Sequence, residues 1–329
     1  MAFELPSFVS AEPDDISVAS LPTPFRVGRV NCYLLSRPPV TVIDPGTLQD
    51  GSLDELALML SSKGLGFEDV EQIVITHAHP DHFGAAAELA ARSGARIVCG
   101  LPEVSSLIEP RDTQSAATVL IRLGIPDETA WTLVASGNEV VTRHVAWADP
   151  SAVVGVLDGE LLAAGGRTFQ CIVTPGHAAG HLSLWDPSAR LLFSGDHLLA
   201  RIIPVPSLEP GDGSARRRSF VEYLSGLNRF VSLDPIVVFP GHGRPFAQVG
   251  VLAARLHAHS RQRAEEIATI LRDGPATPFE IAHRLQWQPE GARLVMGIAN
   301  VQGHLDLLEA RGRVETDLER SAIRYRLAP

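Results

Sequence analysis

One stretch of six residues limits what this chain can fold into more than any other. It holds His77, His79, Asp81 and His82, and it follows the apolar run Ile73–Thr76, which predicts a buried strand. Imidazole and carboxylate groups gathered on a loop at a strand end are typical of a metal site. The stretch therefore predicts that the chain binds metal.

Three later segments repeat this arrangement, since each is a predicted strand followed by a histidine or aspartate beside glycine or proline. His177 follows the strand predicted at Thr168–Val173, Asp196 follows Leu191–Phe193, and His242 follows Ile236–Phe239. Ligands from several strands meet only where the strand ends share one edge of a sheet. A carboxylate between two imidazole-rich groups suits bridging two ions. The pattern predicts a centre of two divalent ions, zinc first, with iron or manganese as alternatives.

The whole motif set resembles that of the metallo-β-lactamase-fold hydrolases. It reads His-x-His-x-Asp-His, Thr-Pro-Gly-His, Ser-Gly-Asp and Pro-Gly-His in this order, and the resemblance covers about residues 25–245. It implies an α+β fold, a four-layer αββα sandwich with the metals at one edge. It also implies a first ion held by His77, His79 and His177, a second held by Asp81, His82 and His242, and Asp196 as the bridge between them.

Asp196 indicates which branches of this family the chain resembles. The best-known zinc β-lactamases have a cysteine at this position, so the aspartate resembles the glyoxalase II, lactonase and RNase-like branches. Quorum-quenching lactonases often have a tyrosine near the bridging aspartate, where this chain continues with His197. Antibiotic hydrolysis and that type of lactonase activity are therefore disfavoured.

The ligand chemistry leads to a hypothesis about mechanism. Two cations that share a water lower its pKa, so that a bridging hydroxide attacks a carbonyl or phosphoryl group near neutral pH. Asp81 is the predicted catalytic residue, which orients the attacking group or relays its proton.

The length of 329 residues favours one large domain with a smaller one attached. We expect residues 1–250 to form the hydrolase domain and residues 251–329 to form a winged-helix domain. Residues 101–150 predict a helical insertion near the cleft, with helical patches at Thr113–Leu123 and Asp127–Leu133. A flap over the cleft and a peripheral helix pair both agree with this pattern.

The C-terminal region predicts three helices and two strands. The helices are expected at Leu252–Asp273, from Pro278 to about Trp287 after a capping box at Thr277 and Glu280, and at Ala292–Glu309, and the strands at Val314–Thr316 and Ile323–Leu327. The order, with Gly303–Glu309 followed by Gly312-Arg313-Val314, resembles the winged-helix domain attached to a subset of the same superfamily. That subset includes a beta-lactamase-like endoribonuclease that acts on single-stranded RNA.

Two predictions concern local structure elsewhere in the chain. The prolines of residues 1–24 predict an extended lead-in, and Asp158-Gly159 predicts a β-hairpin. The cysteines Cys32, Cys99 and Cys171 lie in apolar, strand-like sequence, so we interpret them as small buried hydrophobic residues.

Several polar residues near the motifs have two interpretations. Asp44 is either a turn former or a carboxylate that orients a metal-binding histidine. For His181 the favoured interpretation is a place beside the ligands or in the packing, and His197 and His144 are interpreted as surface or core histidines. Arg216-Arg217-Arg218 either contacts an anionic substrate or belongs to a solvated loop, which we favour.

Two classes of function follow. A net charge of -10 favours a hydrolase of small esters or thioesters, with hydroxyacyl-glutathione or an acyl-CoA as the kind of substrate. The predicted winged helix favours an endoribonuclease on single-stranded RNA, although its third helix offers only Arg293 and His304 as contacts to nucleic acid. We expect a small-molecule substrate, no membrane contact and a cytoplasmic location, with a homodimer as a hypothesis and nucleic acid disfavoured as a partner.

Overall fold

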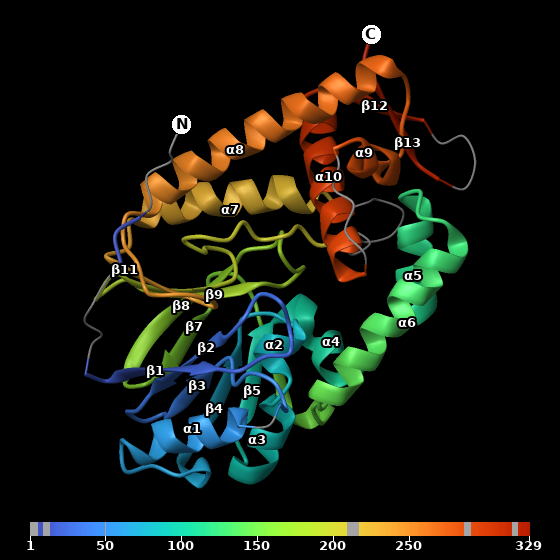
Figure 1. Ribbon diagram of the computed structural model, residues 1–329. Helices are drawn as coiled ribbons and strands as arrows, with labels where there is room; N and C mark the ends of the chain where they lie inside the picture. The colour runs from blue at the N-terminus through green and yellow to red at the C-terminus, as the bar shows by residue number, and fades with distance from the viewer. Residues whose placement is uncertain (1–5, 9–13, 50, 209–216, 286–290, 318–321) are drawn as a thin grey trace.

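Two β-sheets packed face to face form the centre of the molecule in a computed structural model, which describes residues 6–8, 14–49, 51–208, 217–285, 291–317 and 322–329 (Figure 1). The six-stranded sheet has the order β1 (Ile16–Leu21), β2 (Val30–Leu35), β3 (Thr41–Ile43), β4 (Gln72–Ile75), β5 (Arg96–Gly100) and β6 (Val153–Val156). The five-stranded sheet has the order β11 (Val237–Pro240), β10 (Leu191–Gly195), β9 (Leu182–Asp186), β8 (Arg167–Val173) and β7 (Leu161–Ala164).

Helices cover the outer faces of both sheets and form the C-terminal region with a two-stranded sheet. The helices are α1 (Ser52–Ser61), α2 (Pro80–Phe83), α3 (Ala86–Ser93), α4 (Val104–Ile108), α5 (Thr113–Arg122), α6 (Asp127–His144), α7 (Ser219–Leu233), α8 (Val249–Ile270), α9 (Pro278–Arg284) and α10 (Ala292–Ala310). The strands β12 (Val314–Asp317) and β13 (Arg324–Leu327) form the small sheet.

Three clusters of buried apolar side chains separate four layers. The first lies between the six-stranded sheet and helices α1 and α3. The second lies between the two sheets, and the third lies between the five-stranded sheet and helices α7 and α8. Figure 1 shows α7 and α8 stacked beyond one sheet and α1 and α3 beyond the other. The order helix, sheet, sheet, helix confirms the predicted αββα sandwich.

The strand before the histidine stretch shows why the sequence folds in this way. Ile73 and Ile75 of β4 face the first cluster, and Val74 faces the second. Because both faces of this strand are buried, apolar residues occupy successive positions and do not alternate with polar ones. β3, β4 and β5 run parallel, and so do β10 and β11, so the strands that precede the candidate ligands end at one edge of the sandwich.

Helices α5 and α6 from the predicted insertion share a hydrophobic cluster with the C-terminal region. Leu120 and Ala130 are buried there together with Ile267 of α8 and Leu305 of α10. The order of three helices and two strands after residue 249 agrees with the expected order, and the capping box is present, because Thr277 Oγ1 accepts a hydrogen bond from the Glu280 N–H. The domain boundary and the winged-helix assignment stay predictions.

In the described part of the predicted lead-in, residues 16–21 form strand β1, whose backbone is extended and pairs with β2 along its whole length. The predicted hairpin is wrong. Asp158-Gly159 does not close a hairpin, because β6 and β7 belong to different sheets. The hairpin lies instead between β7 and β8, at Gly165-Gly166, where both glycines have positive φ angles.

The three cysteines are buried and free, which confirms their interpretation as small core residues. None of the helices in the described part of the chain is long and apolar enough to cross a membrane.

Candidate metal centre

Four strand ends bring the predicted ligands together at one edge of the sandwich. His77 follows β4, Asp196 directly follows β10, and His242 follows β11. His177 lies on the loop after β8. The short helix α2 begins after His79 and carries Asp81 and His82. Pro80 is its first residue, a position whose N–H would have no partner within the helix, so proline costs no hydrogen bond there.

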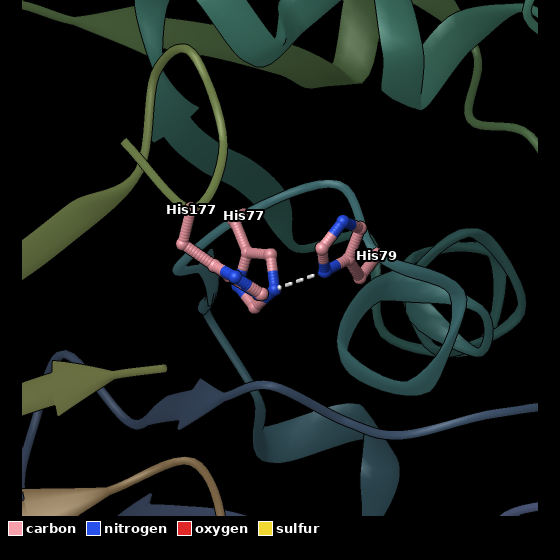
Figure 2. A group of neighbouring side chains, drawn as sticks. All are labelled: His77, His79 and His177. Carbon is pink, nitrogen blue, oxygen red and sulfur yellow. Dashed lines mark hydrogen bonds between the residues drawn. The ribbon is translucent and has the colours of Figure 1, made fainter. Parts of the chain in front are cut away.

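The first group contains His77, His79 and His177. One ring nitrogen from each lies within 4.8 Å of the others, which is close enough for a single ion to bind all three. Figure 2 shows the three rings directed toward a common point. His77 Nε2 and His79 Nδ1 lie 2.8 Å apart. His77 and His79 come from one loop and His177 from another, so the group depends on how the two loops lie against each other.

The second group contains Asp81, His82 and His242, whose ligand atoms also lie within 4.8 Å of one another. Asp81 Oδ2 is 3.3 Å from His242 Nε2. Asp196 lies between the two groups, since its Oδ1 is 3.6 Å from His82 Nε2 and its Oδ2 is 3.7 Å from His177 Nε2. This is the position that a bridging carboxylate requires.

Several of the possible metal-binding atoms lack hydrogen-bond partners, which also fits the binding of divalent ions. Within the described residues, His82 Nε2, His177 Nε2, His242 Nε2 and Asp196 Oδ1 are buried and have no hydrogen-bond partner. The other ring nitrogen of His177 is bonded to the carbonyl oxygen of Val205, and that of His242 to the carbonyl oxygen of Arg29, both at 2.8 Å. These bonds fix each ring with Nε2 directed into the centre, as is common for metal-binding histidines. Buried polar atoms without partners are costly, and bound cations would satisfy them.

The structure decides between the two interpretations of Asp44. One carboxylate oxygen accepts a hydrogen bond from the Thr76 N–H at 2.8 Å, and the other lies 2.8 Å from His82 Nδ1. Asp44 follows β3 with a φ of 52°, a conformation that aspartate tolerates better than most residues. It therefore orients His82 so that Nε2 faces the second group.

The two groups differ in their affinity for protons. Burial lowers the pKa of His77, His79 and His177 below its ordinary value. Burial acts in the same direction on His82 and His242, but Asp196 and its neighbouring carboxylates outweigh it and raise the pKa of both. The first group is therefore neutral at neutral pH, whereas protons compete with an ion for the second.

Asp196 and Asp81 carry negative charge in this centre. Burial raises the pKa of each carboxyl, but His82 and the other histidines outweigh it and lower both pKa values below the ordinary range. Both groups are thus ionised at neutral pH and available to a cation.

The other singled-out histidines lie outside the two groups. His181 is buried beside them, where its Nε2 accepts a hydrogen bond from the Asp196 N–H at 3.1 Å. His181 therefore contacts the backbone of the predicted bridging residue, which agrees with its favoured interpretation as a residue beside the ligands. His197 is buried in the core, with its ring nitrogens facing the carbonyl oxygens of Thr174 and Tyr223, and His144 is half-buried.

The arginine run is paired with carboxylates where the structure describes it. Arg217 contacts Glu222 at 2.8 Å and Arg218 contacts Glu309 at 3.1 Å. Arg216 lies outside the described residues. The favoured interpretation, a surface loop, agrees with these contacts.

Three residues that support the centre were not singled out from the sequence. Asn31 Nδ2 and Tyr33 Oη donate hydrogen bonds to the carbonyl oxygen of Pro240 at 2.9 and 2.7 Å, which holds the loop of His242. Glu103 accepts hydrogen bonds from two of the ligand loops. A polar residue within an apolar strand was the available signal for Asn31, and an acidic residue just after a buried strand was the signal for Glu103.

Close packing at the centre leaves no space for a side chain at Gly241. A Cβ atom there would lie 2.2 Å from Asp196 Oδ1 and 2.8 Å from His82 Cε1. The glycine of the last motif is therefore required by the position of the predicted bridging residue.

Comparisons with known proteins agree with this geometry. The family model of the metallo-beta-lactamase superfamily matches residues 25–242. The chain is 28% identical over 324 residues to the probable metallo-hydrolase YqjP of Bacillus subtilis (strain 168), which covers 95% of this chain and 98% of that protein. It is 25% identical over 222 residues to the hydroxyacylglutathione hydrolase GloC of Haemophilus influenzae, covering 67% of this chain and 88% of that protein. A crystal structure of a metallo-beta-lactamase family protein from Thermus thermophilus superimposes with a TM-score of 0.79 at 27% identity, covering 95% of this chain and 98% of that one.

Proposed function

Because the chain belongs to the metallo-beta-lactamase superfamily, we propose that it hydrolyses an ester or thioester bond of a small molecule with the help of two divalent metal ions. The observation that carries the proposal is a set of four buried atoms without hydrogen-bond partners, namely Asp196 Oδ1 and the Nε2 atoms of the three histidines around it, His82, His177 and His242. A centre built only from imidazole and carboxylate groups suits zinc, and iron or manganese are alternatives.

In this proposal His77, His79 and His177 would hold the first ion. Asp81, His82 and His242 would hold the second, and Asp196 would contribute to both. When bound, the ions would supply Lewis acidity and an activated water near neutral pH. Asp196 fixes the spacing of the two groups, and Asp44 holds the ring of His82 in place.

Asp81 has a separate part in the reaction. Its carboxylate lies 3.3 Å from His242 Nε2 and is ionised at neutral pH, because His82 and His242 lower its pKa. A carboxyl with a lowered pKa is a weak base, so its contribution is to accept a hydrogen bond from the attacking water and orient it rather than to remove its proton.

Two observations support a small ester or thioester as substrate. The relative GloC is named a hydroxyacylglutathione hydrolase, and its match extends over 222 residues, 67% of this chain. The chain is acidic, with a net charge of -10, which favours a small ligand over a polyanion.

A panel of substrates tests the proposal. The purified protein, with its metal content measured, is offered acyl thioesters, lactones, a chromogenic cephalosporin and single-stranded RNA, with Asp196→Ala as the metal-poor control. We expect turnover of thioesters or simple esters, loss of activity on chelation, and recovery on adding Zn²⁺. Cleavage of RNA with no ester or thioester turnover would overturn the choice of substrate.

The second candidate is an endoribonuclease with the same centre. The order of three helices and two strands at the C-terminus favours it, because that order matches the predicted winged helix. The third helix, α10, is a poor surface for nucleic acid, since Ile298–Leu308 are almost all buried and His304 packs on the ring of Phe220. Only Arg293 of the two predicted contacts is exposed, so this candidate ranks second.

A further inference from the structure

Glu103 is a buried carboxylate that the proposed reaction does not use. It ends the short 3-10 turn Leu101–Glu103 after β5, and its side chain is 1% exposed. Glu103 Oε2 accepts a hydrogen bond from the Ala78 N–H at 2.9 Å, and Oε1 accepts one from the Gly180 N–H at 2.6 Å. An acidic side chain is rarely so buried unless its partners are specific.

The two N–H groups belong to the two loops that build the first group. Ala78 stands between His77 and His79, and Gly180 lies three residues after His177. One carboxylate therefore joins the loop that supplies two ligands to the loop that supplies the third. These loops are about a hundred residues apart in the chain. Besides Glu103, one backbone hydrogen bond next to them, from the Leu182 N–H to the carbonyl oxygen of Thr76 at 2.7 Å, also joins them.

The packing around Glu103 leaves little freedom. A Cβ atom at Gly180 would lie 3.0 Å from Glu103 Cγ, and one at Gly100 would lie 2.0 Å from the carbonyl oxygen of Gly180. The ligand loop thus lies directly on the turn that carries Glu103. The following helix, α4, is anchored in the core by Leu107, so the carboxylate is presented from a fixed support.

We propose that Glu103 is a positioning residue that sets the geometry of the first group. The proposal rests on the proposed two-ion centre. Asp44 contacts His82 directly, but Glu103 acts through backbone N–H groups, so it fixes the separation of two loops rather than the tautomer of one ring. Asp44 also accepts hydrogen bonds from the N–H and the hydroxyl of Thr76, which precedes His77, so of the two carboxylates only Glu103 is expected to act on one group alone.

Glu103→Gln is the informative variant, because the amide keeps the shape but offers one oxygen to two donors. It is made in two backgrounds. His242→Ala disables the second group and leaves a single ion on the first, and His79→Ala does the reverse. The metal-free proteins are titrated with Co²⁺, whose visible absorption reports the coordination geometry of the bound ion.

We expect Glu103→Gln to weaken Co²⁺ binding about 10- to 100-fold in the His242→Ala background, as for other residues that orient metal ligands, and to change the absorption spectrum. Binding in the His79→Ala background should stay unchanged. Asp44→Asn should weaken Co²⁺ binding in the His79→Ala background, because Asp44 orients the ring of His82. Glu88→Gln, the same chemical change at a partly exposed residue of α3, should leave both backgrounds unaffected.

Circular dichroism of each metal-free variant separates misfolding from loss of position. If Glu103→Gln does not fold, Glu103→Asp is titrated instead, since its shorter carboxylate keeps one of the two bonds and predicts a smaller loss confined to the first group. The role of Glu103 would be overturned if its substitution lowered Co²⁺ affinity equally in both backgrounds, or did not lower it in the His242→Ala background. A His242→Ala parent that binds no Co²⁺ would instead overturn the proposed metal centre.

Discussion

Asp196 lies between the two groups of the proposed metal centre. Its carboxylate oxygens lie 3.6 Å from His82 Nε2, 3.5 Å from His242 Nε2 and 3.7 Å from His177 Nε2. We expect Asp196→Ala to lose at least one ion and to lower activity by several orders of magnitude, because it removes the carboxylate that lies between the two groups. Metal analysis and assay of the purified variant measure this. Asp273→Ala, at an exposed position, is the matched control, and an Asp196→Ala protein with two ions and full activity would contradict the bridging role.

The opposite pKa shifts of the two groups predict that the ions are lost at different pH. His82 and His242 have raised pKa values, so as pH falls they gain protons first, and those protons compete with the second ion. His77, His79 and His177 have lowered pKa values, so the first ion is held to lower pH. Titrations with Zn²⁺ at pH values between about 8 and 5 should show that the affinity for the second ion falls at a higher pH than the affinity for the first. Loss of both affinities together would contradict the assignment.

Single residues also show where reasoning from sequence stopped. The seven ligands could be predicted because histidines and aspartates beside glycine or proline at strand ends can be recognised in the amino-acid sequence. Glu103 was missed because its partners are backbone N–H groups, which every residue except proline carries, 25 and 77 positions away. Asp44 was left with two interpretations because its partner His82 is 38 positions away.

At the scale of elements, helix α9 begins with a capping box that the sequence predicted. Thr277 Oγ1 accepts from the Glu280 N–H at 3.1 Å, and Glu280 Oε2 accepts from the Thr277 N–H at 2.9 Å. We expect Thr277→Ala to lower the free energy of unfolding by about 1 to 2 kcal/mol, because the N–H group at the helix start loses its side-chain partner. Urea denaturation measures the change. Thr132→Ala, at an exposed position inside α6, is the control and should change it by less than about 0.5 kcal/mol.

Helix α6 shows the limit of periodicity within an element. The predicted patch ended at Leu133, but the helix runs from Asp127 to His144. Ala135-Ser136-Gly137 interrupts the apolar pattern, and Ala130 is the only buried residue of α6, so little periodic signal remains. Packing at its two ends, on the C-terminal region and on the first cluster, extends the helix across this segment.

At the scale of the whole molecule, the C-terminal region completes two hydrophobic clusters that the first 250 residues do not close alone. Leu252 and Leu256 of α8 are buried against α7, and Ile267 and Leu305 are buried against α5 and α6. We expect a fragment of residues 1–250 to be insoluble or to lack a cooperative unfolding transition, because both apolar surfaces become exposed. Size-exclusion chromatography and thermal denaturation measure this.

Co-expression of residues 251–329 as a separate chain is the control for that truncation. It should restore solubility and metal binding if the lost contacts are the cause. A soluble 1–250 fragment that binds two ions by itself would show instead that the predicted boundary separates independent folding units.

The sequence by itself determined the fold class, the strands before each motif and the residues that gather at one edge of the sandwich. It did so because strand burial and ligand chemistry are local properties, written in runs of apolar residues and in single side chains. The tertiary structure alone decided which sheet each edge strand joins, that α5 and α6 share a core with the C-terminus, that Asp44 contacts His82, and that Glu103 joins the loops of His77 and His177. Those features depend on contacts between distant segments, whose free energy comes from packing and from hydrogen bonds to backbone groups that no sequence pattern marks.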